Sequence, residues 1–389
     1  MKNNKKLSGF KSGLILFLLV FCSIAGVGFV SGAEIQSFFA KQGNYAYFGL
    51  GLFFVLVTIL IYKIMLEVSF FDKNISSRLS ENLSKKSKFK SKFSIFKSKF
   101  KEIAVFLNIF CVCSAMIAGL RVYSKNIYNN NYFIFFIIVL LVIFILLLFG
   151  VKWFSKLEFL MMIFVVFLLS YFIFHNKFEL FYVTSGSINF SKPVAGLKNF
   201  GLIKRNEISC SSLLGVVEQG IMSNVNLILK SLGLAVLYVF MNMFHIKPVI
   251  KASNIKFKNK KECFIFSFIF SGTLTAILVV FTSFLISNSW LSLSPMPVLT
   301  FFQSQGTFFA KFFNFGLVFC LVISLVSCLL GLKSEFVEIL KPKNSYQNFL
   351  VLILSLVSAL IFSILPFDFF VSKIYPLLGL INLFCFVFC

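Results

Sequence analysis

The chain has 389 residues, of which 59% are hydrophobic and only 13% charged, and its mean hydropathy is +0.95. Soluble globular domains are nearer half apolar and a quarter charged, so the composition excludes an ordinary soluble enzyme. The formal net charge of +24 would suit a nucleic-acid-binding protein, but the lysines stand in short loops between apolar runs. No soluble domain remains to read a nucleic acid, so we expect an all-α integral membrane protein with no nucleic-acid partner.

Ten apolar runs predict ten transmembrane helices, because a helix needs about 20 residues to cross a hydrocarbon core about 30 Å thick. Charged or polar residues bound each run, and the corner around Pro366 and Asp368 separates the last two. We place the runs at 13–39, 46–66, 103–124, 132–151, 156–175, 228–246, 262–287, 307–331, 347–366 and 368–388. The whole chain, 1–389, is expected to form a single polytopic membrane domain.

The ten runs divide into two sets of five, 13–175 and 228–388. Five is an odd number, so the two halves would cross the membrane with opposite topology, as in transporters built from inverted repeats. The halves share no visible residue identity, and equal length alone is a weak indication. The polar segment between them, 178–227, is expected to lie outside the membrane and to carry a surface helix near 213–228.

Basic residues are distributed unequally between the two sides of the predicted membrane. With the N-terminus inside, 26 of the 37 basic residues fall in inner segments, which predicts a multi-pass cell-membrane protein with both termini cytoplasmic. The basic start, the apolar run and the small residues near 31–33 would also fit a cleaved signal peptide. The apolar stretch 14–30 is longer than a usual signal core, which favours a retained helix.

Three glycines, Gly26, Gly28 and Gly32, fall within seven residues of the first run. Each lowers helix propensity by about 1 kcal/mol relative to alanine, which favours a local break. A break frees backbone groups that lipid cannot satisfy, so a cavity, water, ion or ligand must do so. The alternative is that Gly28 and Gly32 form a small-residue face that packs against another helix.

Glu34 and Ser31 are candidate ligands beside these glycines. A carboxylate in an apolar span usually faces the bundle interior or water, where Glu34 could carry a proton, pair with a cation or bind an amine. The alternative is that the hydrocarbon ends near Gly32 and that Glu34 lies at the interface.

Two further polar pairs lie in the sixth and eighth runs. Tyr238 and Asn242 are four residues apart and therefore share a helical face, where they could complete the solute site. Ser324 and Ser327 are three apart, and hydroxyl oxygens suit a hard cation such as Na⁺. All four residues could instead join helices through hydrogen bonds.

The first run carries a resemblance to a known family. It resembles the glycine-rich first-helix signature of the uncharacterised YkvI-like membrane proteins, in the amino acid-polyamine-organocation (APC) superfamily, through Gly26-Val27-Gly28-Phe29-Val30-Ser31-Gly32-Ala33-Glu34-Ile35 and the following Phe38-Phe39. The stretch from Tyr238 to Val249 is similar to the sixth helix of those proteins. The resemblance implies a LeuT-like fold of five plus five helices, with helices 1 and 6 discontinuous at a central solute site.

The resemblance also implies an ion site. In sodium-coupled members of that fold, carbonyls of helix one, here that of Ala25, and adjacent hydroxyls of helix eight hold the ion. This chain has Ile323-Ser324 at the place of the adjacent pair, so one hydroxyl is missing. Ser327 would have to replace it, or Glu34 would carry a proton instead.

Residues 73–102 form a basic inner loop with eight lysines between 85 and 101. Phe89, Phe93, Phe96 and Phe100 would line one helical face, which indicates an amphipathic helix on an anionic inner leaflet. The alternative is a lysine-rich linker.

The sequence contains no nucleotide-binding loop, hydrolase motif or metal-ligand spacing, so we expect neither an enzyme nor a cofactor. The pattern favours a permease, or symporter, that moves a small organic solute such as an amino acid or related amine by Na⁺- or H⁺-coupled alternating access. A solute sensor on the same fold and a structural membrane component of a complex are the alternatives. The sequence determines neither the solute nor the oligomeric state.

Overall fold

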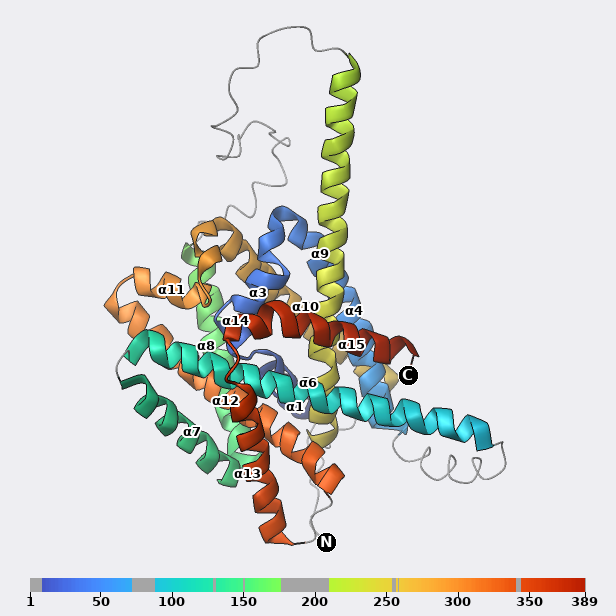
Figure 1. The fold of residues 1–389 in the computed structure, drawn as a ribbon, viewed down its shortest axis with the longest axis vertical. Helices are drawn as coiled ribbons and strands as arrows, with labels where there is room; N and C mark the ends of the chain where they lie inside the picture. Colours follow the sequence, from blue (N-terminus) through green and yellow to red (C-terminus); the bar gives the residue numbers. More distant parts are fainter. Residues whose placement is uncertain are drawn as a thin grey trace.

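A computed structural model describes residues 9–71, 88–128, 131–149, 151–175, 210–253, 257, 259–340 and 344–388. Every regular element in these ranges is a helix (Figure 1). Within the described ranges, six helical segments are long and apolar enough to cross a membrane, and four shorter apolar helices accompany them. The chain is therefore an α-helical, membrane-embedded protein.

Each predicted run contains at least one helix. The long helices are α1 (Gly9–Ile24), α4 (Ala46–Leu66), α6 (Lys88–Tyr128), α7 (Tyr132–Phe149), α8 (Val151–His175), α9 (Cys210–Ser253), α10 (Lys260–Ser287), α12 (Thr307–Leu340), α13 (Ser345–Phe362) and α15 (Tyr375–Phe388). The short helices are α2 (Val27–Val30), α3 (Ala33–Phe38), α11 (Pro297–Ser304) and α14 (Phe367–Phe369). Two 3₁₀ helices, η1 (Ala40–Tyr45) and η5 (Ser289–Leu293), and two π-helices, η2 (Glu67–Phe71) and η6 (Phe370–Ile374), complete the described elements.

The first apolar run lies inside the bundle. Helix α1 contacts α8, α9, α10 and α12, and α3 contacts α9, α10 and η6. The side chains of Phe21, Ala25, Phe29, Val30 and Ile35 are fully buried. Burial on all sides explains why this segment is apolar around its whole circumference rather than on one stripe.

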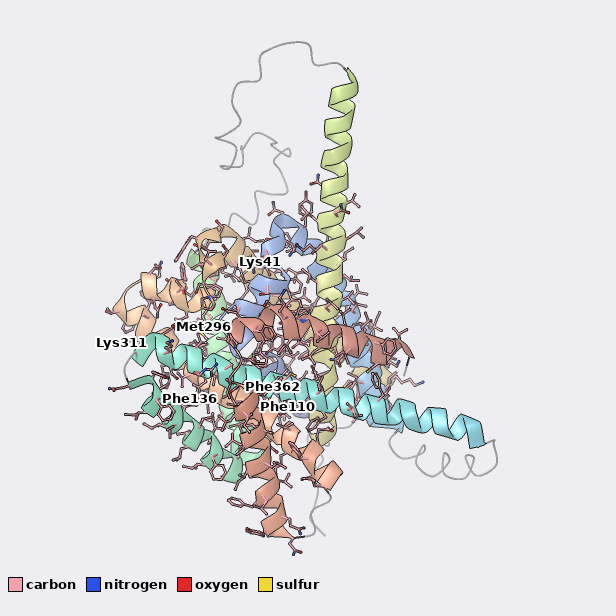
Figure 2. All side chains as sticks on the ribbon, viewed as in Figure 1. Lys41, Phe110, Phe136, Met296, Lys311 and Phe362 are labelled. Atoms are coloured by element: carbon pink, nitrogen blue, oxygen red, sulfur yellow. The ribbon has the colours of Figure 1, made fainter. Side chains whose placement is uncertain are left out.

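The periphery of the bundle is apolar as well. Helix α7 exposes the large side chains of Phe133, Ile134, Ile138 and Leu141 on its outer face. An apolar surface of this extent is rare on soluble monomers and fits hydrocarbon. Aromatic contacts also join neighbouring helices, as between Phe110 of α6 and Phe362 of α13, whose ring centroids are 5.3 Å apart (Figure 2).

The expectation that helix 6 is discontinuous is wrong. Helix α9 runs without interruption through 44 residues, including the stretch that resembles a broken helix. Within 234–247 the sequence contains neither glycine nor proline, and Pro248, near the end of the resembling stretch, lies inside the helix without ending it. Among the described runs, only the first contains a discontinuous helix of the kind that the resemblance implies.

The predicted segment 178–227 ends inside this helix. Residues 210–227 form the first half of α9 rather than a separate surface helix, and this half extends beyond the neighbouring helices in Figure 1. At 1.5 Å per residue the helix is about 66 Å long, roughly twice the hydrocarbon thickness. Residues 176–209 lie outside the described residues.

The basic loop is partly described. Residues 88–102 form the first turns of α6 and continue directly into the third apolar run, so the helical part of that prediction is confirmed. Of the four phenylalanines predicted to line one face, only the side chain of Phe100 is described. Its ring centroid lies 6.2 Å from that of Phe384 of α15. Residues 72–87 lie outside the described residues, and the location on a leaflet stays a prediction.

Candidate functional site

The first apolar run is broken twice, as its glycines predicted. Helix α1 ends at Ile24, and the Gly26 N–H donates to the Ile24 carbonyl at 2.7 Å instead of to a carbonyl four residues back. The second break, at Ser31 and Gly32, separates α2 from α3. Gly32 has a φ of +80°, a conformation that costs other residues roughly 1–2 kcal/mol.

Protein groups from distant helices satisfy the carbonyls that the breaks free. The Ser324 hydroxyl of α12 donates to the Ala25 carbonyl at 3.0 Å and lies 3.4 Å from the Cys22 carbonyl. The Val298 N–H of α11 donates to the Ser31 carbonyl at 3.0 Å. The broken segment is therefore held by α11 and α12 through its backbone.

Glu34 lies in the first turn of α3 and is buried, with 5% of its surface exposed. The Tyr238 hydroxyl of α9 donates to its Oε2 atom at 3.3 Å. Among the residues that the structure describes, no cation forms an ion pair with this carboxylate. The geometry brings Glu34 and Tyr238 together, as a shared site requires, and the depth of Glu34 in the membrane stays a prediction.

Gly28 makes room for this carboxylate. A Cβ atom added at Gly28 would lie 2.1 Å from Glu34 Oε1 and 2.6 Å from its Cδ, far inside contact distance. The Glu34 side chain therefore folds back across α2. Ser31 lies three residues after Gly28, and its hydroxyl is 3.4 Å from the Gly28 carbonyl oxygen. The absence of a side chain at Gly28 therefore makes room for Glu34 of the same broken segment, and does not serve only the packing of two helices.

Tyr238 is fixed by an aromatic cage. The rings of Phe38, Phe39 and Phe53 lie 5.0, 5.3 and 5.8 Å from the Tyr238 ring. Asn242 donates its amide to the Tyr238 carbonyl at 3.0 Å, within its own helix. Asn242 is thus near the carboxylate but is bonded to the backbone of α9.

The two predicted ion-site serines differ. Ser324 is fully buried and bonded to the break, so the structure brings Ala25 and Ser324 together. Ser327 is half-buried, and its hydroxyl makes no hydrogen bond to any described residue.

Gly26 also makes room for a close neighbour. A Cβ atom added at Gly26 would lie 2.5 Å from the Met116 methyl group.

Three polar residues that lie close to α9 were not predicted. Tyr375 begins α15 directly after the π-helix η6 and lies within electrostatic range of both Glu34 and Tyr238. Asn108 of α6 and Asn382 of α15 are fully buried and donate to the consecutive Met241 and Phe240 carbonyls of α9, at 3.0 and 3.1 Å. Their signal in the sequence is an isolated polar residue in an apolar span.

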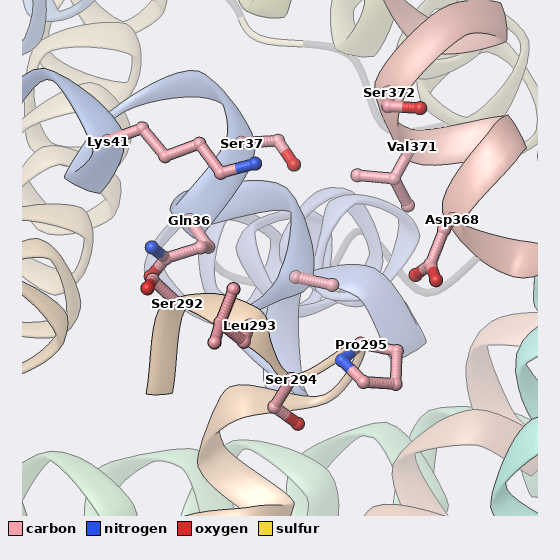
Figure 3. A pocket seen from close by; sticks show the side chains of 11 residues that line it. Gln36, Ser37, Lys41, Ser292, Leu293, Ser294, Pro295, Asp368, Val371 and Ser372 are labelled. Carbon is pink, nitrogen blue, oxygen red and sulfur yellow. The ribbon is translucent and has the colours of Figure 1, made fainter. Parts of the chain in front are cut away.

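A pocket of about 260 Å³ lies beside this site (Figure 3). Its walls come from α3 and η1, from the turn between η5 and α11, and from α14 and η6. Ala33, the neighbour of Glu34, is one of its lining residues. We call this cavity the Lys41–Asp368 pocket after the two charged residues that line it.

The chain matches no protein-family model, and no curated protein matches it either.

Proposed function

We propose that the protein is a secondary transporter that moves a small organic solute by ion-coupled alternating access. The observation that carries the proposal is the Glu34 carboxylate, buried at a twice-broken helix in the bundle interior and bonded to Tyr238 of α9. Charged residues inside membrane helices are costly and mark ion, proton or substrate pathways. Discontinuous helices are the usual place for such sites in transporters.

The carboxylate supports coupling more strongly than a packing role. A packing contact at this position could be made by an apolar side chain without the desolvation cost of a carboxyl group. Glu34 instead accepts one tyrosine hydrogen bond and has no cationic partner among the described residues. A proton, or the amine of a solute, is the partner that would neutralise it.

The same geometry favours a proton over Na⁺ as the coupling ion. The Ala25 carbonyl, which would be a sodium ligand in the implied ion site, already accepts the Ser324 hydroxyl. Glu34 is then the group that exchanges the coupling proton, and Ser31, Tyr238 and the opened backbone at Gly26 and Gly32 bind the solute.

The architecture is proposed to be LeuT-like, with helix 1 discontinuous and helix 6 continuous. The N- and C-termini lie in the cytoplasm, and the basic start of α6 faces the anionic inner leaflet of the cell membrane. In this orientation the end of the bundle that carries η1 and η5 faces outward. Solute would enter from that end and pass the two breaks of the first helix.

The test is uptake of radiolabelled amino acids and amines into proteoliposomes that contain the purified chain, with an inward proton gradient or an inward Na⁺ gradient. We expect proton-driven uptake of at least one solute, and Glu34→Gln should abolish the gradient-driven component. The matched control is Glu262→Gln, which changes a carboxylate in the first turn of α10, away from the breaks.

Two outcomes would overturn the proposal. Uptake that Glu34→Gln leaves unchanged would remove the carboxylate from the mechanism. Solute binding without uptake under either gradient would favour a sensor on this fold.

A further inference from the structure

We infer that the Lys41–Asp368 pocket is a binding site for a small zwitterion, separate from the Glu34 site. The inference goes beyond the proposed function, because it concerns binding at a second place and holds whether or not the chain transports. It rests on the two charges of the pocket, a buried amide at its wall, its polar lining and its size.

Two opposite charges face the pocket from different elements. Lys41 belongs to η1 and Asp368 to α14, and Figure 3 shows their side chains on opposite sides of the cavity. Within the described part of the chain, neither forms an ion pair with the other or with a third residue. A ligand with a carboxylate at one end and an ammonium group at the other could pair with both at once.

Gln36 supplies a second, independent indication. It lines the pocket from α3 and is buried, with 6% of its surface exposed. Its Oε1 atom has no hydrogen-bond partner among the described residues. A buried acceptor without a partner costs about 1–3 kcal/mol, and a hydrogen-bond donor on a ligand in the pocket would satisfy it.

The remaining polar lining is neutral. Ser37, Ser292 and Ser372 contribute hydroxyls from three different walls, and none of the three makes a hydrogen bond to a described residue. Ser294 is bonded to Thr300 and to the Met296 N–H, which fixes the turn that carries the wall. One cation, one anion and free hydroxyls select a molecule that is polar and neutral overall.

The size of the pocket limits the ligand. Its volume of about 260 Å³ is below the roughly 300–1,000 Å³ of sites that enclose drug-sized ligands. A compact zwitterion of the size of a short amino acid fits this limit, whereas a long peptide does not. The ligand class is therefore a small molecule that carries one ammonium and one carboxylate group.

The fluorescence of Trp290 provides a signal for ligand binding in the pocket. It lies in η5, two residues before Ser292 of the pocket wall, and the chain has only two tryptophans. With Trp153 changed to phenylalanine, the fluorescence of the full-length protein in nanodiscs reports on η5 alone. The probes are glycine, β-alanine and 4-aminobutanoate, with propanoate and propylammonium as analogues that lack one charge, all at constant ionic strength.

We expect a saturable fluorescence change with at least one of the three zwitterions and about tenfold weaker binding of propanoate and propylammonium. Lys41→Ala and Asp368→Asn should each weaken zwitterion binding by about tenfold, and the matched control Lys311→Ala, which removes an exposed lysine outside the pocket, should not. Saturation-transfer NMR with the same probes on the chain that retains Trp153 provides the same comparison without the background substitution.

Four results would overturn the inference. Equal affinity for propanoate would make the pocket an anion site, and equal affinity for propylammonium would make it a cation site. Loss of binding in Glu34→Gln would mean that the probe reports on the Glu34 site. Absence of saturable binding for all three zwitterions, by fluorescence and by NMR, would leave the pocket without a ligand of this class.

Discussion

The Tyr238 hydroxyl of α9 donates a hydrogen bond to Glu34 of α3 across 204 positions of sequence. Both side chains are buried, so the bond is shielded from water and joins the broken first helix to the longest helix of the protein. This contact links the discontinuity of the first helix to α9, and any movement of α3 relative to α9 must alter it.

Tyr238→Phe removes this bond and keeps the aromatic cage. We expect a loss of unfolding free energy of about 1–3 kcal/mol, because the Glu34 oxygen is left buried without its donor. In the proteoliposome assay the variant should also lose most gradient-driven uptake. Thermal unfolding in detergent and uptake are measured on the same preparation.

The control for Tyr238→Phe is Tyr62→Phe, which removes a tyrosine hydroxyl on α4 that makes no hydrogen bond to a described residue. Equal effects of the two changes would show that the loss comes from the hydroxyl in general rather than from the bond to Glu34.

Gly28→Ala should be destabilising although it places alanine, a better helix former, in α2. The added Cβ would lie 2.1 Å from Glu34 Oε1, so the carboxylate must leave its position and the Tyr238 bond must break. We expect a cost of about 2–4 kcal/mol from overpacking and the lost bond, measured by thermal unfolding. Gly51→Ala, on α4 with open space at its Cβ position, should instead be neutral or stabilising by up to about 1 kcal/mol.

A compensating variant separates the two causes. Gly28→Ala combined with Glu34→Ala should recover most of the stability, because the clashing carboxylate is gone, but it should not recover uptake. Failure of the double variant to recover stability would mean that Gly28 is required for the backbone of α2 and not for the space it leaves.

The break in the first helix could be predicted because its cause is local. Glycine acts on its own backbone, so Gly26 and Gly32 indicate the break without knowledge of any neighbour. Glu34 and Tyr238 could each be selected as a costly polar group in an apolar span. A shared site was a prediction, but the direct hydrogen bond between the two side chains could not be predicted, since it depends on how α3 and α9 pack.

The unpredicted parts of the site depend on distant residues. Asn108 and Asn382 bond to consecutive carbonyls of α9 from two other helices, and nothing within 228–246 indicates those donors. The Lys41–Asp368 pocket is assembled from three separate parts of the chain. The error on α9 arose because a similarity to a broken helix was followed although 234–247 contains neither glycine nor proline, and Pro248 is accommodated inside the helix.

Gly32→Ala tests the second break. The left-handed conformation should cost about 1–2 kcal/mol, and the added Cβ would also lie 2.9 Å from a Val298 methyl group. Val298→Ala removes the methyl group that the added Cβ would meet and leaves the Gly32 backbone unchanged. We expect Gly32→Ala to lose more stability in the unaltered chain than in the Val298→Ala background, as measured by thermal unfolding. Equal losses in the two backgrounds would show that Val298 moves aside freely.

Ser324→Ala tests the attachment of α12 to the first break. The change removes the donor to the Ala25 carbonyl, and a buried carbonyl left unpaired costs about 1–3 kcal/mol. Ser327→Ala, one turn along the same helix, should change the melting temperature little because its hydroxyl makes no hydrogen bond to a described residue.

The melting temperature of the unaltered chain should be the same in Na⁺ and K⁺, since the Ala25 carbonyl that a cation would need already accepts the Ser324 hydroxyl. A selective stabilisation by Na⁺ that Ser324→Ala removes would contradict this prediction and show that the serine oxygen binds the cation, which would make Na⁺ the coupling ion in place of the proton.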